Sequence, residues 1–476
     1  MGKRNTMTFV TWGLRLSIAS FALIHFLTVF IEYEFLLSLL SFSGLFIFLF
    51  ACIHVTPLKF KIPLSIFIIG VTIIVLAEGP IIEGVLHGIL QMRGVIGLLI
   101  IVPIVSWILH EEPYVEDIMA YFHKVLNTSR KFYFGLVSFT QIITYFLLFG
   151  SIPMMYQFVN MILNEARGEV WENYKGTALL RGFALSSLWV VSIPSFIYSI
   201  DTLGASLWTA ILQGFGIAII GTVLSVVFAI FQEKKYGVRL TPILQKEINN
   251  VLEHASHEKV RKYKVLEFFV LFVSLFGTIF LLHALLHVPL MTIIPLVIVV
   301  WTFSFYIYKR KIGKFMKVSV DYFKNDMIKQ SYQLSIMIVV GTLIYGLNQT
   351  EFATTVVNGL YYTQEVIPFI NLLYLLPFIV IMLGLFSLGP LTVMVLVAGI
   401  LESLALPYPP ELIVLAITSG SAISILLSPF VMPVIVLSAT NGLSLFKNGI
   451  KFNMKYAIAL YVIVQLYIQT MILVWN

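Results

Sequence analysis

Apolar stretches long enough to cross a bilayer recur along almost the whole chain. A transmembrane helix needs about 20 apolar residues, and backbone groups in lipid must be hydrogen-bonded within a helix or a closed barrel. The continuous candidates for spans, about eleven in number, are Val10–Phe30, Phe35–Val55, Ile62–Ala77, Gly94–Leu109, Leu179–Ser199, Ala205–Phe231, Val265–Leu286, Pro289–Tyr308, Tyr332–Leu347, Leu412–Ile435 and Tyr456–Trp475. The sequence therefore predicts an all-α polytopic membrane protein whose first partner is the lipid bilayer.

The composition excludes several other classes of protein. The chain is 59% hydrophobic and only 11% charged, whereas an ordinary globular domain is about 25% charged. A surface this poor in charge rules out a soluble enzyme. We also expect no nucleic-acid partner, although the formal net charge is +7. Cys52 is the only cysteine, so the chain cannot contain an internal disulfide.

Two further apolar stretches are too long for one span. They are Tyr133–Leu163 and Val366–Leu404, and each is interrupted in the middle. The first interruption is Gly150-Ser151-Ile152-Pro153 and the second is Ser387-Leu388-Gly389-Pro390. Glycine and proline at these points release backbone groups from helical hydrogen bonding.

The distribution of basic residues decides how the first of these stretches is counted. Lysine and arginine concentrate in cytoplasmic loops of membrane proteins. Lys3 and Arg4 therefore place the N-terminus in the cytoplasm, and the strongly basic segment Gln232–Lys264 is also expected there. Only two clear spans lie between Lys131 and that segment, so Tyr133–Leu163 must enter and leave on the same side. We predict a re-entrant hairpin.

The same reasoning applies to the second long stretch. The loop after Tyr308 is basic, and so is the loop that carries Lys447, Lys451 and Lys455. Both loops are cytoplasmic only if Val366–Leu404 is a second hairpin, entering from outside. The C-terminus is then expected outside the cell.

The two halves of the chain share one order of elements. The predicted parts are a leading helix in residues 1–34, a first repeat over 35–231 with its hairpin at 133–163, a cytoplasmic basic linker over 232–264, and a second repeat over 265–476 with its hairpin at 366–404. Tyr145–Pro153 resembles Met382–Pro390, and Ala184–Ser187 resembles Ile417–Ser421. Chance similarity of apolar strings is the alternative. Inverted repeats with interrupted hydrophobic segments are typical of secondary transporters.

This order of spans, hairpins and Ser-rich broken helices resembles the ion transporter superfamily. That group includes divalent-anion symporters, citrate and arsenite carriers, and the large membrane subunit of tripartite dicarboxylate transporters. The resemblance covers nearly the whole chain in architecture but little of it in motif. Sodium-coupled dicarboxylate members carry Ser-Asn-Thr at both hairpin tips, where this chain has Ser151-Ile152-Pro153 and Leu388-Gly389-Pro390. The resemblance implies a transporter of an anionic solute that moves one domain against a scaffold.

The candidate substrate-binding residues lie at the hairpin tips and on the two broken helices. They are Gly150, Ser151, Pro153, Ser186, Ser187, Ser387, Gly389, Pro390, Thr418, Ser419, Gly420 and Ser421. Exposed helix ends at membrane depth attract anions at the N-terminus and cations at the C-terminus. Small and hydroxyl residues also let transmembrane helices pack closely, which is the simpler explanation for any one of them.

Two ionisable residues are candidates for coupling or gating. Arg181 begins the expected span Leu179–Ser199 and could guide an anion, or its side chain could extend to the membrane interface. Asp201 lies between two expected spans. It is either a solvated turn residue or a partner for a proton or sodium ion.

The predicted function is secondary active transport of a small organic or inorganic anion, driven by a sodium or proton gradient. The alternative is a non-transporting membrane protein, such as an enzyme or partner subunit for lipid-linked substrates. No P-loop, nucleophile–base arrangement or metal-ligand spacing occurs in the sequence, so we expect neither an enzyme nor a bound metal or cofactor beyond a transported ion.

The expected location is the inner (plasma) membrane. Val10–Phe30 is longer than the apolar core of a signal peptide, so no cleavable leader is expected. The residue pattern leaves two partners open, a homodimer and an external solute-binding protein.

Overall fold

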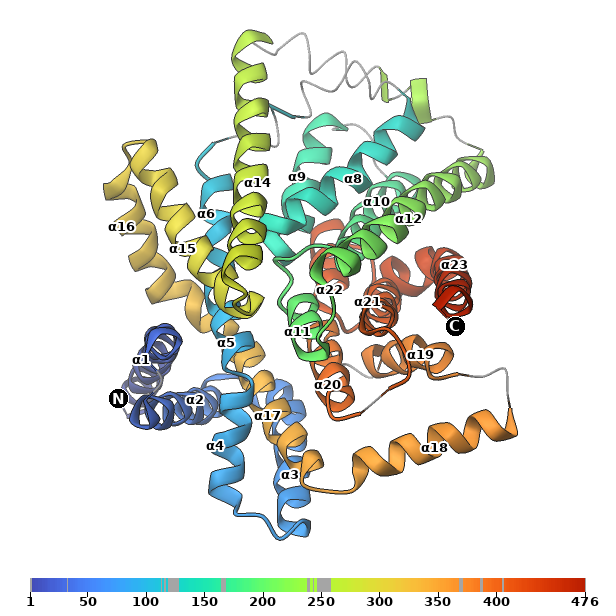
Figure 1. Cartoon of the computed structure of the whole chain (residues 1–476). Coiled ribbons are helices and arrows are strands. Elements are labelled where there is room, and N and C mark those ends of the chain that lie inside the picture. The colour runs from blue at the N-terminus through green and yellow to red at the C-terminus, as the bar shows by residue number, and fades with distance from the viewer. Residues whose placement is uncertain are drawn as a thin grey trace. The chain divides into compact units, whose positions relative to one another are not determined.

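The computed structural model describes most of the chain. The described residues are 2–31, 33–112, 114, 117–118, 128–163, 168–237, 240–242, 244–245, 258–367, 371–385, 388–404 and 406–475. Within these ranges the chain is helical and contains no strand. The helices form two compact units, and each unit takes segments from both halves of the sequence (Figure 1). The compact units therefore differ from the predicted repeats, which are contiguous along the chain.

Unit 1 comprises Met1–Trp107, Thr278–Pro368 and Val395–Leu406. Its helices are α1 (Gly2–Phe30), α2 (Glu34–His54), α3 (Pro57–Leu76), α4 (Ile81–Gln91), α5 (Arg93–Ile101), η1 (Val102–Val105), α15 (Leu290–Tyr308), α16 (Ile312–Asp321), η3 (Tyr322–Asp326), η4 (Met327–Gln330), α17 (Ser331–Asn348) and α18 (Phe352–Val366). Helix α17 packs against α2, α3 and α4, and α15 packs against α5.

Unit 2 comprises Ile108–Gly277, Phe369–Met394 and Pro407–Asn476. Its helices are α8 (Ser129–Leu147), η2 (Leu148–Gly150), α9 (Ser151–Ile162), α10 (Glu169–Ser186), α11 (Pro194–Leu203), α12 (Leu207–Tyr236), α19 (Leu372–Leu385), α21 (Pro410–Leu427), α22 (Met432–Asn441), η5 (Lys447–Lys451) and α23 (Phe452–Trp475). Three helices belong partly to each unit: α6 (Ser106–Leu109), α14 (Glu258–Leu286) and α20 (Pro390–Leu401).

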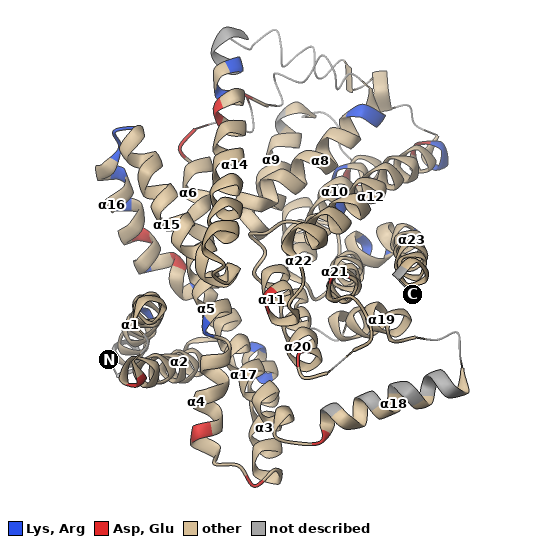
Figure 2. Cartoon of the chain, viewed as in Figure 1, with Lys and Arg blue, Asp and Glu red and all other residues tan. Residues whose placement is uncertain are grey.

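The lengths of the apolar helices confirm the membrane class. Ten helical segments of the described chain are long and apolar enough to cross a bilayer, and an eleventh is obtained if α4 and the α5–α6 run, bent by 48°, count as one span. Leu372–Leu385 and Pro390–Leu401 are apolar but shorter. Figure 2 shows long helical stretches without charge, with most charged residues near helix ends. The chain is an all-α protein of the multi-pass membrane type.

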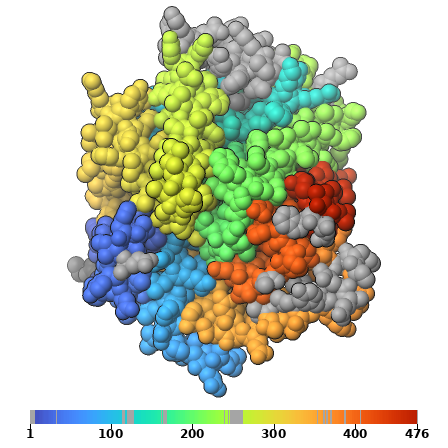
Figure 3. All heavy atoms as spheres, viewed as in Figure 1, coloured from blue at the N-terminus to red at the C-terminus, as the bar shows by residue number. Residues whose placement is uncertain are grey.

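The outer helices of unit 2 keep apolar side chains at the surface. Helix α12 exposes Trp208, Leu212, Phe215, Ile219, Val223, Val227 and Phe231 along its length, and it lies open in the green part of Figure 3. These side chains recur at helical spacing, whereas Ala210, Gly214, Ile217 and Gly221 face inward and are buried. A helix with one apolar exposed face and one small-residue face suits a bundle packed in lipid.

Two expected spans are interrupted in the structure. The stretch Leu179–Ser199, predicted as a broken helix, is divided in the structure, and its first part begins earlier than expected, because α10 runs from Glu169 to Ser186. Pro194 then starts α11, and a proline cannot continue a helix because it lacks an N–H group and clashes with the preceding turn. The predicted span Leu412–Ile435 is likewise divided, since α21 ends at Leu427 and α22 starts at Met432.

The predicted linker and the second hairpin tip are described only in part. Helix α12 continues to Tyr236 and α14 begins at Glu258, so both ends of the predicted linker 232–264 are helical. Most residues between these helices lie outside the described ranges. Ser387, predicted at the second hairpin tip, also lies outside them.

Candidate functional site

Helices α10 and α21 form the centre of unit 2. Every residue of α10 from Asn173 to Ser186 is buried, and so is every residue of α21 from Leu412 to Leu427. Helix α10 packs against α8, α9, α12 and α21, and α21 packs against α19 and α23. Each of these two central helices ends at an interruption, which places non-helical backbone inside the unit.

The two interrupted helices contact each other within unit 2. Helix α10 contacts both α21 and α22, and α11 contacts α21. The segments Ser187–Ile193 and Ser428–Val431 therefore belong to neighbouring elements in the core of unit 2. The last carbonyl groups of α10 accept hydrogen bonds from N–H groups of the first interruption: Ala184 from Ser187, Leu185 from Leu188, and Ser186 from Trp189 and Val190. The first N–H groups of α11 and α22 lack partners within their own helices, and helix starts of this kind can bind anions.

A third element, the turn between α8 and α9, joins this region. Helices α8 and α9 meet at η2, where they form a V in Figure 1, and η2 contacts α22. The Ser192 hydroxyl, in the first interruption, donates a hydrogen bond of 2.6 Å to the Tyr145 carbonyl near the end of α8. The Trp189 indole donates to Gln141 at 3.0 Å, and Gln141 donates to Thr222 on α12 at 3.0 Å.

The backbone at η2 is strained. Leu148 has a φ of 45° and a ψ of −123°, a backbone conformation that residues other than glycine rarely adopt. The Ser151 hydroxyl bonds to the Leu148 carbonyl at 2.7 Å and lies 3.0 Å from the Thr144 hydroxyl. Strain of this kind costs about 1–3 kcal/mol and is concentrated at functional sites. The break was predicted at Gly150–Pro153, and it falls at Leu148–Gly150.

The predicted residues of the first tip and first broken helix have different surroundings. Gly150 is exposed, Ser151 is buried, and Pro153 is half-buried in the first turn of α9. The hydroxyls of Ser186 and Ser187 donate to carbonyls of their own helix, at Phe183 and Ala184. Ser187 nevertheless occupies the first position of the interruption.

The Thr418–Ser421 group lies within α21 instead of at its end. The Thr418 hydroxyl bonds to the Leu415 carbonyl, and a Cβ atom added to Gly420 would lie 2.6 Å from the Pro377 carbonyl oxygen of α19. Ser419 and Ser421 are buried, with 2% and 1% of their surface exposed, and neither hydroxyl has a hydrogen-bond partner among the described residues. Buried hydroxyls without partners are uncommon, so these two are the strongest candidates for ligand contact.

The second tip is less connected to this region. Gly389 is half-buried and Pro390 begins α20. Among the described atoms beyond its chain neighbours, only the Thr392 hydroxyl oxygen comes within 4.0 Å of a Cβ atom built on Gly389. The break between α19 and α20 falls where the sequence predicted it.

Arg181 is an interior residue instead of the start of a helix, which corrects the sequence prediction. It lies in the fourth turn of α10 and is fully buried. Its Nε donates to Asn453 Oδ1 at 3.0 Å, and its Nη atoms donate to the Tyr133 hydroxyl and to the carbonyls of Ser225 and Phe452. The guanidinium also lies 4.4 Å from the centre of the Tyr456 ring. No carboxylate of the described chain forms an ion pair with it.

Asp201 is helical, although a turn between two spans was expected. It lies in the last turn of α11, half-buried, three residues before Gly204 ends the helix in the left-handed conformation. The connection to α12 is therefore shorter than the sequence suggested.

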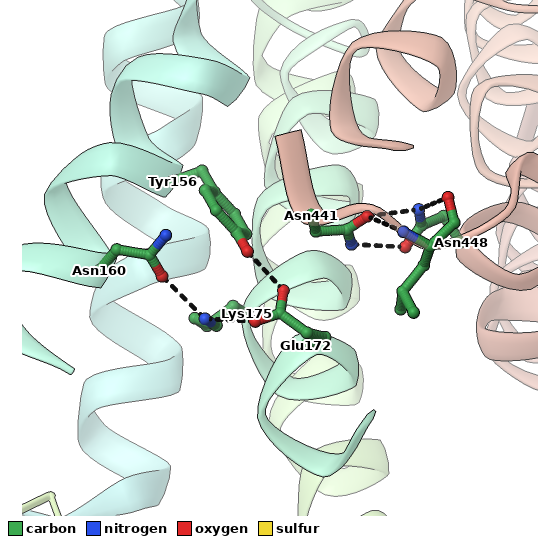
Figure 4. A network of polar contacts seen from close by, with 7 residues as sticks. Tyr156, Asn160, Glu172, Lys175, Asn441 and Asn448 are labelled. Carbon is green, nitrogen blue, oxygen red and sulfur yellow. Dashed lines mark hydrogen bonds and ion pairs between the residues drawn. The ribbon is translucent and has the colours of Figure 1, made fainter. Parts of the chain in front are cut away.

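The sequence prediction missed a buried polar cluster between α9 and α10 (Figure 4). Lys175 Nζ lies 2.6 Å from Glu172 Oε1 and donates to Asn160 Oδ1 at 2.7 Å. The Tyr156 hydroxyl donates to Glu172 Oε2 at 2.6 Å. The signal was present as a Glu–Lys pair at i, i+3 spacing. The pair lies before the predicted span Leu179–Ser199, outside every stretch that the hydropathy pattern predicts to be helical.

Two asparagines, Asn441 of α22 and Asn448 of η5, form a pair beside α10. Asn441 and Asn448 donate to each other's side-chain oxygens at 2.8 and 3.0 Å, and Asn448 also donates to Ser438 at 2.9 Å. A Cβ atom on Gly176 would lie 3.5 Å from Asn441 Nδ2. Glycine at this position lets α22 and η5 approach α10 closely.

Neither a protein-family model nor a curated protein matches this sequence. Within the described ranges, no three His, Cys, Asp or Glu side chains gather as metal ligands would. The candidate site is therefore defined by the geometry of unit 2.

Proposed function

We propose that this protein is a secondary active transporter of a small anionic solute, built from two inverted repeats with re-entrant hairpins. In this proposal, the solute binds where the two interrupted helices cross, beside the η2 turn. The observation that carries the proposal is the contact of α10 with both α21 and α22 and of α11 with α21. Interrupted helices at the centre of a membrane protein are characteristic of transporter binding sites.

The spacing of the breaks supports the repeat. Nearly the same number of residues separates Gly150 from Ser187 and Gly389 from Ser428, and each pair marks a helix break and the next interruption. In this proposal the equivalent of Ser187 is Ser428, whereas the local sequence similarity pairs the region of Ser187 with Ile417–Ser421. Each half then contains two helices that meet at a break, an interrupted helix and a final apolar helix.

The buried charge favours an anion. Arg181 carries a positive charge in the core of unit 2 without a carboxylate. Six residues of helix separate it from Ser187, a rise of about 9 Å. At an effective dielectric constant of about 20, a unit charge at that distance contributes roughly 2 kcal/mol. Protein groups accept hydrogen bonds from Nε and from both Nη atoms of Arg181, so in this proposal it acts on the solute through its electric field.

The hydroxyl groups of α21 supply direct contacts. Ser419 and Ser421 have buried, unpartnered oxygens and can donate to an anion or complete the shell of a coupling ion. In the same proposal, the N-terminus is cytoplasmic and the protein lies in a plasma membrane. Glu169 at the start of α10 forms an ion pair of 2.7 Å with Lys447 at the start of η5. In this proposal the starts of α10 and η5 therefore lie on the same side of the membrane.

The test is uptake into proteoliposomes that contain the purified protein. The probes are labelled succinate, citrate, sulfate and phosphate, with an imposed sodium gradient, a pH gradient or neither. We expect gradient-dependent accumulation of at least one probe. The double variant Ser419→Ala/Ser421→Ala should lose it, whereas Ser335→Ala should retain it, because the Ser335 hydroxyl bonds within its own helix in unit 1. Absence of gradient-dependent flux for all four probes would contradict the proposal.

A further inference from the structure

Unit 1 contains a partly open cavity of about 230 Å³. Its walls come from α1, from the run α5–η1–α6, from α15, and from α16 with the η3 and η4 turns that follow it. Most of the wall is aliphatic or aromatic, including Ala19, Ala22, Trp107, Phe315 and Phe323. An apolar cavity of about 150 Å³ stays dry and holds a benzene ring, so this larger cavity has room for a hydrocarbon guest.

The polar side chains of the wall offer little to a polar guest. The Tyr322 hydroxyl donates to the Ile100 carbonyl and accepts a hydrogen bond of 3.0 Å from Gln330 Nε2. The other polar side-chain groups of the wall are the Ser319 hydroxyl and the Trp107 indole. Because a buried polar guest is unfavourable unless its groups are hydrogen-bonded, the cavity favours a hydrocarbon chain.

A half-buried arginine lies one turn of α1 away from the cavity wall. Arg15 precedes Ala19 by four residues and Ala22 by seven, so the three side chains lie on one face of the helix. Arg15 Nε is buried and has no hydrogen-bond partner among the described residues. The guanidinium carbon lies 5.0 Å from the centre of the Trp12 ring, and the Trp12 and Phe323 ring centres are 6.4 Å apart. A cation with an unpartnered donor therefore lies beside the apolar cavity.

Arg15 lies near one surface of the membrane. Its guanidinium is over Trp12, which is closer than Arg15 to the start of the apolar segment Thr6–Phe30. Arg15 is also close enough to His54 for their charges to interact, and His54 is the last residue of α2. A long side chain at the level of a helix end reaches the headgroup region of a bilayer.

Helix α16, which forms one wall of the cavity, is amphipathic and basic. Ile312, Met316 and Val320 make an exposed apolar row at helical spacing. Segment 309–330 contains seven lysines or arginines and two aspartates, and Figure 2 shows basic residues at the turn between α15 and α16. A basic amphipathic helix binds at the interface of membranes that carry anionic lipids. The surface beside the cavity therefore favours lipids of negative charge.

We propose that unit 1 binds an anionic phospholipid, with an acyl chain in the cavity and the phosphate at Arg15. A guanidinium presents its N–H groups in a fork that matches phosphate oxygens. Basic pockets between transmembrane helices bind anionic lipid headgroups in other membrane proteins. The bound lipid contacts both α1 and α16, so it stabilises their packing. This inference is independent of the proposed transport function, because it concerns unit 1 alone.

The first test counts bound lipid by native mass spectrometry. The purified full chain in mild detergent is incubated with phosphatidylglycerol or with phosphatidylcholine that has the same acyl chains. We expect one phosphatidylglycerol per chain at concentrations that leave phosphatidylcholine unbound. Equal retention of the two lipids, or retention of neither, would overturn the proposal. Palmitate at the same concentration should not displace phosphatidylglycerol, and displacement would overturn the assignment to a phospholipid.

Substitutions test the two ends of the site separately. Ala22→Phe fills the cavity, and its control Ser20→Phe places the same ring at an exposed position of α1. Arg15→Gln removes the cation, and its control Arg310→Gln removes an exposed charge after α15. Retention of phosphatidylglycerol should be lost in Ala22→Phe and fall about tenfold or more in Arg15→Gln, with little change in either control. Unchanged retention in Ala22→Phe or in Arg15→Gln would overturn the proposal.

Thermal unfolding shows whether the filled variants fold and respond to lipid. Added phosphatidylglycerol should raise the unfolding midpoint of the unmodified protein and of Ser20→Phe, because a ligand that binds only the folded state stabilises it. The rise should be smaller in Ala22→Phe. The smaller substitution Ala22→Leu is measured in parallel, so that a result remains if the phenylalanine ring disturbs folding. An equal lipid-induced rise in Ala22→Leu and in the unmodified protein would place the acyl chain outside the cavity and overturn the proposal.

Discussion

Arg181 Nε donates a hydrogen bond of 3.0 Å to Asn453 Oδ1, across 272 positions of the sequence. Asn453 in turn donates through Nδ2 to the carbonyls of Asn448 and Gly449 in the π-helical turn η5. The guanidinium therefore ties the central helix α10 to the start of α23. This tie lies in the same unit as the crossing of the interrupted helices, so it bears on the rigidity of the proposed site.

Replacing Arg181 should destabilise the protein strongly. Arg181→Met leaves Asn453 Oδ1 and the Tyr133 hydroxyl without their donor, and a buried polar group without a partner costs about 1–3 kcal/mol. We expect a clear fall in the thermal unfolding midpoint of the purified protein in detergent. Arg181→Lys keeps the charge but loses the planar donor arrangement, so its unfolding midpoint should lie between those of the unmodified protein and Arg181→Met.

The control for this prediction is Arg130→Met. Arg130 is exposed at the start of α8, and its loss should change the midpoint little. Similar midpoints for the Arg181→Met and Arg130→Met proteins would show that the buried network adds nothing to stability.

A single methyl group should test where the first interruption packs. A Cβ atom on Gly214 of α12 would overlap the Leu188 carbonyl oxygen, whereas one on Gly216 meets no atom within 4 Å. Gly214→Ala should therefore displace the segment 187–193 and lower the unfolding midpoint, since overpacking costs about 1–3 kcal/mol. Gly216→Ala should be neutral or slightly stabilising, because alanine favours helix more than glycine does. A lower unfolding midpoint for Gly216→Ala than for Gly214→Ala would mean that segment 187–193 does not pack against Gly214.

The spans were predictable from sequence because the rule behind them is local. An apolar run of about 20 residues has few alternatives to a transmembrane helix, and α2, α12, α15 and α23 lie close to their predicted bounds. Glycine and proline also act locally. For that reason the break before α9 and the break before α20 fall within a few residues of their predicted places.

The interior polar residues were not predictable in the same way. Glu172 and Lys175 make the first turns of α10 look like a loop when hydropathy alone is considered, and Arg181 looks like the start of a helix. They are helical and buried because protein groups from α8, α9 and α23 satisfy them. Those partners are distant in sequence, and no local pattern identifies them. Helix α12 exposes apolar side chains, whereas the polar side chains of α10 are buried against protein, an arrangement that suits a bundle packed in lipid.

Removing the unpartnered hydroxyls of α21 should separate stability from ligand binding. Ser419→Ala and Ser421→Ala each delete a buried oxygen that has no hydrogen bond, so the midpoint without ligand should stay constant or rise. If an anion binds at the proposed site, the thermal shift that it produces should shrink in both variants, since tighter binding of a ligand to the folded state gives a larger stabilisation. Thr418→Val should lower the ligand-free midpoint slightly, because its hydroxyl bonds to the Leu415 carbonyl. A full ligand-induced shift in the double serine variant would remove these residues from the site.

The pairing of Glu169 should make stability depend on pH. Glu169 lies 2.7 Å from Lys447 Nζ and 3.7 Å from Lys451 Nζ. The hydrogen bond and charge of Lys447, with a contribution from Lys451, lower the pKa of the Glu169 carboxyl below its ordinary value of 4.5. The folded protein therefore binds this proton less readily than the unfolded chain, so the pair stabilises the fold above the ordinary pKa. That stabilisation is lost as the pH falls through the lowered value.

The comparison is between the unmodified protein and Glu169→Gln, with unfolding midpoints recorded from neutral to acid pH. The unmodified protein should be slightly more stable at neutral pH, and the difference should vanish in acid, where both side chains are uncharged. The effect is small because the glutamate is exposed and water screens the pair. Glu34→Gln, at an exposed helix start in unit 1, should show no such change. A difference that persists unaltered into acid would mean that the variant acts through packing instead of charge.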